Sequence, residues 1–95
     1  EKYPDYCFVQ ERHQVRDILA ASGKVCAVFN GHVHRNNLST IDGIHYITVQ
    51  SLVEKVGEPD LASRAFATAE IEASRLLFAV HGEDAVQYDV LLRLP

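Results

Sequence analysis

The chain has 95 residues, of which 47% are hydrophobic and 23% are charged, a composition typical of a folded chain that argues against intrinsic disorder. A chain of this length holds one modest core, so we expect residues 1–95 to form a single domain or part of one. The formal net charge of -4 provides no attraction for a phosphate backbone, which disfavours general binding to nucleic acid.

Targeting and redox features are sparse. No apolar run is long enough to span a membrane and no signal-peptide pattern opens the chain, so we expect a soluble protein and favour the cytoplasm. The two cysteines, Cys7 and Cys26, are too few for a disulfide scaffold, and the apolar neighbours of Cys26 indicate a packing role. Methionine is absent even at position 1, so we expect a processed chain or a piece of a longer protein.

The first predicted element is a helix over 11–22. Val15, Ile18 and Leu19 recur at i, i+3 and i+4 with charged residues between them, so one helix face can be buried. Gly23 follows and predicts a left-handed helix stop.

A short apolar run and a hairpin follow the helix. Val25–Phe29 is too short for a helix and predicts a buried central strand, followed by a polar loop over 31–37. Leu38–Ile41 and Ile44–Val49 flank Asp42-Gly43, the dipeptide that suits a tight hairpin turn. Ligand sites gather beyond the carboxyl ends of such strands, so the polar loop is where we look for chemistry.

The remainder of the chain is predicted to be β-rich. Residues 51–61 contain glycine and proline and should be irregular. Three further strands are expected at Ala65–Ile71, Leu76–His81 and Val86–Leu92, with short turns between them. The fold class is therefore α/β or α+β, with one N-terminal helix and a mixed, mostly antiparallel β-rich segment.

One local motif stands out, Gly31-His32-Val33-His34, directly after the predicted central strand. In extended backbone, side chains at i and i+2 point to the same side, so His32 and His34 can converge on one site. Gly31 allows the chain to approach that site closely, without a Cβ clash. Imidazole is a common ligand for zinc, iron and manganese, although two histidines on a polar loop can equally be solvated side chains.

In its context this motif resembles the last conserved block of the calcineurin-like metallophosphoesterase family, which reads glycine-histidine-any-histidine. The resemblance covers residues 11 to 90 and weakens beyond Glu54. The stretches that carry it are Val15–Leu19, Gly23–Val25, Ala27–Asn36, Asp42–Ile44 and Tyr46–Thr48.

The resemblance implies that the chain is the C-terminal portion of an αββα sandwich that binds two divalent ions of the manganese, iron or zinc class. It implies that His32 binds one ion and His34 the other, and that the complete enzyme is a phosphohydrolase acting on phosphomonoesters or phosphodiesters, either small molecules or nucleotides. The family's earlier aspartate- and histidine-rich blocks are absent here, so we expect the isolated chain to be inactive without its N-terminal half.

The polar neighbours of the histidine pair are candidates for a supporting role. Arg35, Asn36, Asn37 and, less strongly, Asn30 can orient a ligating ring or contact a phosphate oxygen, or they can be ordinary surface residues. His13, His45 and His81 are interpreted as solvated or packing side chains rather than ligands.

Two alternatives stay open. The chain can be a non-catalytic, β-rich interaction module derived from the family, and its exposed sheet edge would then lead to self-association. A third hypothesis is a single-metal site that His32 and His34 build across two subunits.

Overall fold

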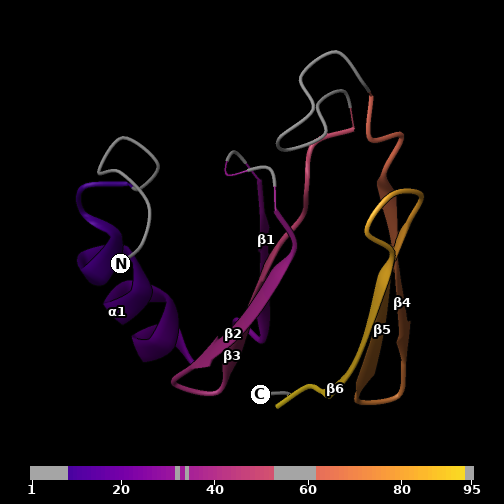
Figure 1. Cartoon of the computed structure of the whole chain (residues 1–95). Coiled ribbons are helices and arrows are strands. Elements are labelled where there is room, and N and C mark those ends of the chain that lie inside the picture. The colour runs from indigo at the N-terminus through magenta and orange to yellow at the C-terminus, as the bar shows by residue number, and fades with distance from the viewer. Residues whose placement is uncertain (1–8, 32, 34, 53–61, 94–95) are drawn as a thin grey trace.

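The computed structural model describes residues 9–31, 33, 35–52 and 62–93. Over these residues the chain forms one helix and two three-stranded sheets (Figure 1). The elements are α1 (Arg12–Ser22), β1 (Ala27–Asn30), β2 (Asn37–Ile41), β3 (Ile44–Thr48), β4 (Phe66–Glu72), β5 (Arg75–His81) and β6 (Val86–Leu91).

The helix ends as predicted, but its apolar face is not buried. Gly23 has a φ of 68° and its N–H donates to the Ala20 carbonyl oxygen at 3.3 Å, which is the left-handed cap that the sequence predicts. No residue of α1 is buried, and Ile18 is 69% exposed. The predicted burial of this face is therefore wrong for the described part of the chain, because no layer of that part covers it.

The first sheet has the strand order β1-β3-β2. β2 and β3 form the predicted hairpin, and Asp42 and Gly43 have the positive φ angles, 53° and 77°, of its tight turn. β1 pairs in parallel with β3 alone. The prediction of a central strand at Val25–Phe29 is therefore wrong in its position: the strand forms at Ala27–Asn30 and lies at the sheet edge, because the described residues provide no second neighbour.

The second sheet is an antiparallel meander, β4-β5-β6, and confirms the three strands predicted for the second half. The side chains of β5 alternate strictly between the core and the other face, with Leu76, Phe78 and Val80 buried. This period of two gives β5 one entirely apolar face.

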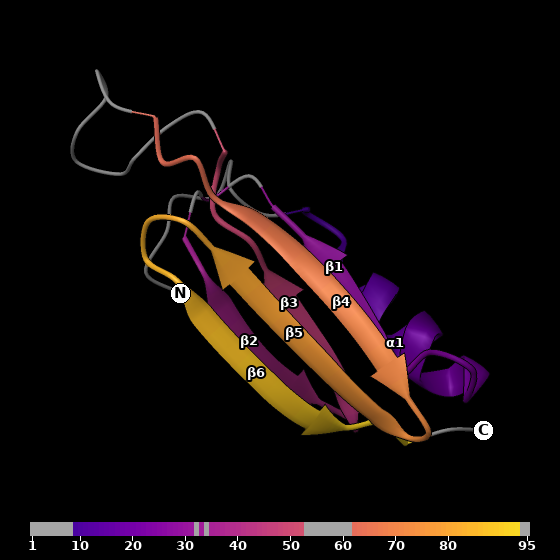
Figure 2. The ribbon, with the colours of Figure 1, turned by 90° about the vertical axis from the view of Figure 1, so that its right-hand side faces the viewer.

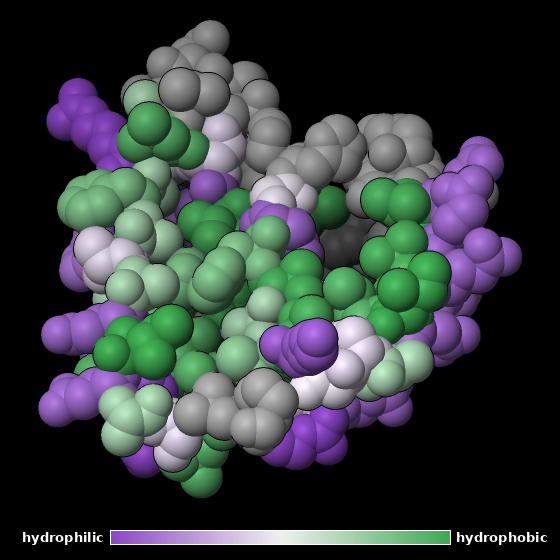
Figure 3. Space-filling model, turned by 180° about the vertical axis from the view of Figure 1, so that it is seen from behind, coloured by the Kyte–Doolittle hydropathy of each residue, from purple (hydrophilic) through white to green (hydrophobic). Residues whose placement is uncertain are grey.

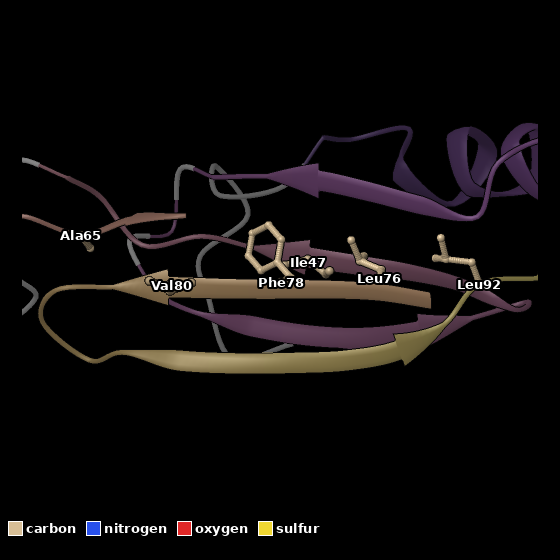
Figure 4. Packing of buried hydrophobic residues seen from close by; sticks show 6 residues of the cluster. All are labelled: Ile47, Ala65, Leu76, Phe78, Val80 and Leu92. Atoms are coloured by element: carbon tan, nitrogen blue, oxygen red, sulfur yellow. The ribbon is translucent and has the colours of Figure 1, made fainter. Parts of the chain in front are cut away.

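The two sheets pack face to face, with β1 and β4 on one flank of the sandwich and β2 and β6 on the other (Figure 2). Phe78 lies at the centre of the contact: its ring stacks on Phe29 of the first sheet at 5.3 Å and on Tyr88 of β6 at 6.3 Å between centroids. The buried cluster, drawn in Figure 4, consists of Ile47, Ala65, Leu76, Phe78, Val80 and Leu92.

Cys26 packs against this cluster, as predicted, and its thiol is not in a disulfide. The architecture is α+β with a high β content, which confirms the coarse fold class. No helix in the part of the chain that the structure describes is long and apolar enough to cross a membrane.

A histidine joins the sheets at the hairpin end of the sandwich. His45 lies between a hydroxyl and a carbonyl, with Nδ1 at 2.8 Å from Thr40 Oγ1 and Nε2 at 2.7 Å from the Leu91 carbonyl oxygen. A carbonyl only accepts, so Nε2 carries a proton and donates across the sandwich. Both ring nitrogens are engaged, which agrees with the packing role expected for His45.

Gly82 should be the glycine that tolerates alanine least. Its φ is 98°, and an added Cβ would lie 2.6 Å from the Arg64 carbonyl oxygen, whereas at Gly23, with φ 68°, it would meet nothing within 4 Å. We expect Gly82→Ala to lower the free energy of unfolding by about 2 kcal/mol or more and Gly23→Ala by about 1 kcal/mol. Denaturant unfolding measures both, and equal losses would contradict the steric argument.

Stability should fall at alkaline pH because of Tyr88. Partial burial raises the pKa of the Tyr88 phenol above its ordinary value of 10.0, so the folded chain favours the neutral form. This contribution is complete below pH 10.0 and is lost as the pH rises through the higher pKa of the folded state. Denaturant unfolding across this range should show the decline, and Tyr88→Phe should make it shallower; an identical profile would refute the assignment.

Candidate functional site

The predicted ligands His32 and His34 lie outside the described residues, so their roles stay predictions. The structure does describe where their connection begins and ends. β1 and β2 lie on opposite sides of β3, and β1 runs parallel to β3. Residues 31–36 therefore connect two strand ends at the edge where the carboxyl ends of β1 and β3 meet, the position at which parallel strands commonly present ligand-binding loops.

The connection starts from a firmly held strand end. The Asn30 carbonyl oxygen accepts a hydrogen bond from the Val49 N–H at 2.9 Å, and Asn30 Oδ1 accepts one from Thr48 Oγ1 at 2.6 Å. The side-chain amide of Asn30 thus takes part in tying β1 to β3, directly before Gly31.

The connection ends at a second anchor, on Asn36. Asn36 Nδ2 donates to the Asp84 carbonyl oxygen at 3.0 Å, and Asn36 Oδ1 accepts from the Gln50 N–H at 3.1 Å. Gln50 is only 8% exposed, and its Nε2 donates to the Glu83 carbonyl oxygen. Two neighbouring carbonyls of the β5–β6 turn therefore hold two side-chain amides of the first-sheet segment, an arrangement we call the amide clamp (Asn36, Gln50, Glu83 and Asp84).

The remaining polar candidates face outward. Asn37 is exposed and its Nδ2 donates to Ser39 Oγ at 3.1 Å. The sheet register aligns Asn37 with Thr48, and Thr48 with Asn30, so Asn30 and Asn37 lie in one row across the sheet. Arg35 is also exposed. Asn30, Asn37 and Arg35 therefore flank the histidine motif, whereas Asn36 is turned toward the second sheet.

Gly31 has room for a side chain in the described structure. Its φ is not positive, and an added Cβ would meet only the Val49 carbonyl oxygen, at an ordinary contact distance of 3.8 Å. The expected close approach at Gly31 therefore does not involve the described residues.

The other histidines do not join the motif. His81 stacks on Phe66 at 4.9 Å and its Nε2 lies 3.1 Å from Thr68 Oγ1, and His13 is exposed on α1 beside Arg16. Both placements agree with the solvated or packing roles expected for them. Among the described residues no three His, Cys, Asp or Glu side chains are grouped so that they could hold a metal ion.

A second surface feature is an apolar flank on the side of β1 and β4. Phe29 is 49% exposed although its ring stacks on Phe78, Ile71 of β4 is 67% exposed, and Val15 and Ile18 of α1 are exposed as well. Figure 3 faces this flank and shows hydrophobic side chains across its centre, with hydrophilic side chains at the margins. The outer edge of β1 has no strand partner in the described part. We call this surface the open flank (Val15, Ile18, Phe29 and Ile71).

Sequence reasoning missed Gln50 and the β5–β6 turn. A glutamine after an alternating strand normally reads as a surface residue, and the turn lies more than thirty residues further along the chain, since Gln50 and Glu83 are 33 positions apart. The turn composition Gly82-Glu83-Asp84 was the available hint in the sequence, and in the structure Gly82 and Asp84 do have positive φ.

No protein-family model matches the chain, and neither does any curated protein or solved structure. The described residues form an α+β sandwich. In it, Asn30 and Asn36, which flank the histidine motif, are hydrogen-bonded near the carboxyl ends of the parallel strands β1 and β3.

Proposed function

We propose that the chain is the C-terminal part of a divalent-metal-dependent phosphoesterase and that His32 and His34 are ligands to its metal ions. The observation that carries the proposal is the anchored connection over 31–36, which starts at Asn30 and ends at Asn36 beside the carboxyl ends of β1 and β3. A Gly-His-x-His motif between two anchored residues suits a metal site, because ligand sites are most precise when rigid elements carry them.

The donor chemistry of this motif fits ions of the manganese, iron or zinc class. Two imidazoles are too few for a two-metal centre, and the described residues contain no additional group of ligands. The remaining ligands would come from the missing N-terminal half of the domain. When bound, such ions polarise the phosphoryl group and neutralise the charge that develops on its oxygens.

The chain's own polar residues have definite roles in this proposal. Arg35 is exposed next to the motif, and its guanidinium suits a phosphate oxygen because it is always charged and donates two hydrogen bonds at once. Asn37, in the same row as Asn30, can donate to a phosphate oxygen or to a ligating side chain. The substrate class is a phosphomonoester or phosphodiester, as a small molecule or a nucleotide.

The open flank supports the same proposal independently of the loop. Among the described residues, the outer edge of β1 has no strand partner, and Phe29 and Ile71 are exposed. A further layer of the same domain would cover such an apolar surface and pair such an edge.

Replacing both proposed ligands should remove the activity of the complete protein. We expect His32→Ala combined with His34→Ala to lower divalent-metal-dependent hydrolysis of an aryl phosphate by at least about 100-fold, since even residues that only support a ligand contribute 10- to 100-fold. His13→Ala, an exposed histidine on α1, is the matched control and should keep full activity. Unchanged hydrolysis in the double variant would refute the proposal.

The open flank also favours a second candidate function, a non-catalytic interaction module that self-associates. Apolar side chains and an unpaired edge on one flank form a self-complementary surface when two copies meet around a twofold axis. In this case the isolated chain covers Ile71 and Phe29 with a second copy.

Self-association can be tested with charged residues on this flank. We expect Ile18→Lys combined with Ile71→Lys to shift sedimentation velocity of the isolated chain from oligomer to monomer, because each buried lysine at the contact would lose its hydration. Leu91→Lys is the control, since Leu91 is 65% exposed, as Ile71 is at 67%, but lies on β6 at the other flank. A wild-type chain that sediments as a folded monomer at high concentration would contradict the module.

A further inference from the structure

The second sheet has one face that no described element covers. Figure 2 faces it and shows no described helix or strand in front of β4, β5 and β6, and Figure 1 places α1 on the opposite side of the molecule, beyond the first sheet. Because Leu76, Phe78 and Val80 of β5 point into the core, the residues that alternate with them in the three paired strands point outward. We call the outward residues of β4, β5 and β6 the outer face.

Apolar side chains form a row that runs diagonally across the outer face. Phe66 of β4 is 56% exposed, Leu77 of β5 is 37% exposed and Leu91 of β6 is 65% exposed. The register aligns Phe66 with His81 at one end of the face and Leu91 with Arg75 at the other, and Leu77 lies between these ends on the central strand. Single apolar residues are ordinary on a surface, but a row of them on one face is typical of an interaction site.

Carboxylates lie on both sides of this row. The register places Glu70 of β4 and Asp89 of β6 opposite Leu77, one on each side, and it places Glu72 opposite Arg75. Arg75 is the only lysine or arginine in β4, β5 and β6, and its guanidinium pairs with Asp89 at 2.7 Å. Among the described residues, Glu70 and Glu72 have no ion-pair partner. The outer face therefore carries uncompensated negative charge beside its apolar row.

From this arrangement we propose that the outer face is a docking surface for a basic amphipathic helix of a partner protein. A helix with an apolar stripe bordered by lysine and arginine places its stripe on the Phe66–Leu77–Leu91 row and its cations beside Glu70 and Glu72. β5 has 7 residues and is about 20 Å long, a length that about 13 helical residues match. The inference does not involve the histidine motif and is independent of the proposed function.

The charge of the outer face decides between its possible occupants. A phosphate backbone or an anionic lipid surface would be repelled by the carboxylates. A second copy that packed the same face against this one would bring Glu70 and Glu72 toward the like charges of its partner, which costs free energy. A cationic partner gains from the same charges, so its chemistry complements both the apolar row and the carboxylates.

The test titrates the 95-residue chain with a synthetic helical peptide of about 15 residues, in which leucines line one side and lysines border them. Fluorescence anisotropy measures the affinity, and NMR of the backbone amides locates the contact. We expect the shifts to fall on β4, β5 and β6. The affinity should weaken about threefold to tenfold in Glu70→Gln combined with Glu72→Gln, the loss typical of two exposed ion pairs, and it should also weaken in Leu77→Thr, which shortens the centre of the apolar row.

The matched control removes two charges from the other side of the molecule. Glu11 and Asp17 are exposed at and within α1, so Glu11→Gln combined with Asp17→Asn changes the net charge equally and should keep the wild-type affinity. Circular dichroism verifies that each variant is folded. A peptide with glutamate in place of every lysine is the second control and should not bind.

Four results would overturn the proposal. An equal loss of affinity in the Glu11 and Asp17 variant would show that binding follows net charge alone. Amide shifts confined to α1 and the first sheet would place the contact elsewhere, and equally tight binding of the glutamate peptide would remove the charge argument. If the chain alone forms an oligomer that Leu77→Thr dissociates, the occupant of the outer face is a second copy.

Discussion

The contact between the apolar face of β5 and the first sheet is the interaction on which the rest of the structure depends. In the part of the chain that the structure describes, each three-stranded sheet buries its apolar face against the other sheet, and small sheets are stable only when one face is covered. Phe78 is central, because it stacks on Phe29 across the sandwich and on Tyr88 beside it. This packing sets the distance between the sheets, and the polar contacts at both ends depend on that distance.

Those polar contacts differ in kind at the two ends of the sandwich. At the hairpin end, His45 donates to the Leu91 carbonyl oxygen across the sheets. At the other end, the side chains of Asn36 and Gln50 hold the carbonyls of the β5–β6 turn. In each case a side-chain donor satisfies a backbone carbonyl near the rim of the core, which avoids the cost of an unpaired polar group there. The proposed ligand loop is therefore coupled to the second sheet, although its sequence neighbours belong to the first.

The open flank has the opposite physical character. Phe29 stacks on Phe78 and is still 49% exposed, and Ile71 and Ile18 are largely exposed. The flank and the loop agree in one respect, since a further protein layer would complete both: it would cover the apolar area and the strand edge on the flank, and it would add to the metal ligands that we propose at the loop. In the proposed function, that layer is the remainder of the phosphoesterase domain.

The sequence by itself determined the local elements. The spacing of Val15 and Ile18, the stop at Gly23, the Asp42-Gly43 turn and the alternation in β5 each depend on neighbours within one or two turns of chain, so they follow from backbone geometry and side-chain period. The tertiary structure alone decided that, among the described residues, β1 lies at an edge and the helix face stays uncovered, and that Gln50 reaches the β5–β6 turn. These features depend on which distant segments meet, and periodicity within a segment carries no information about its partner.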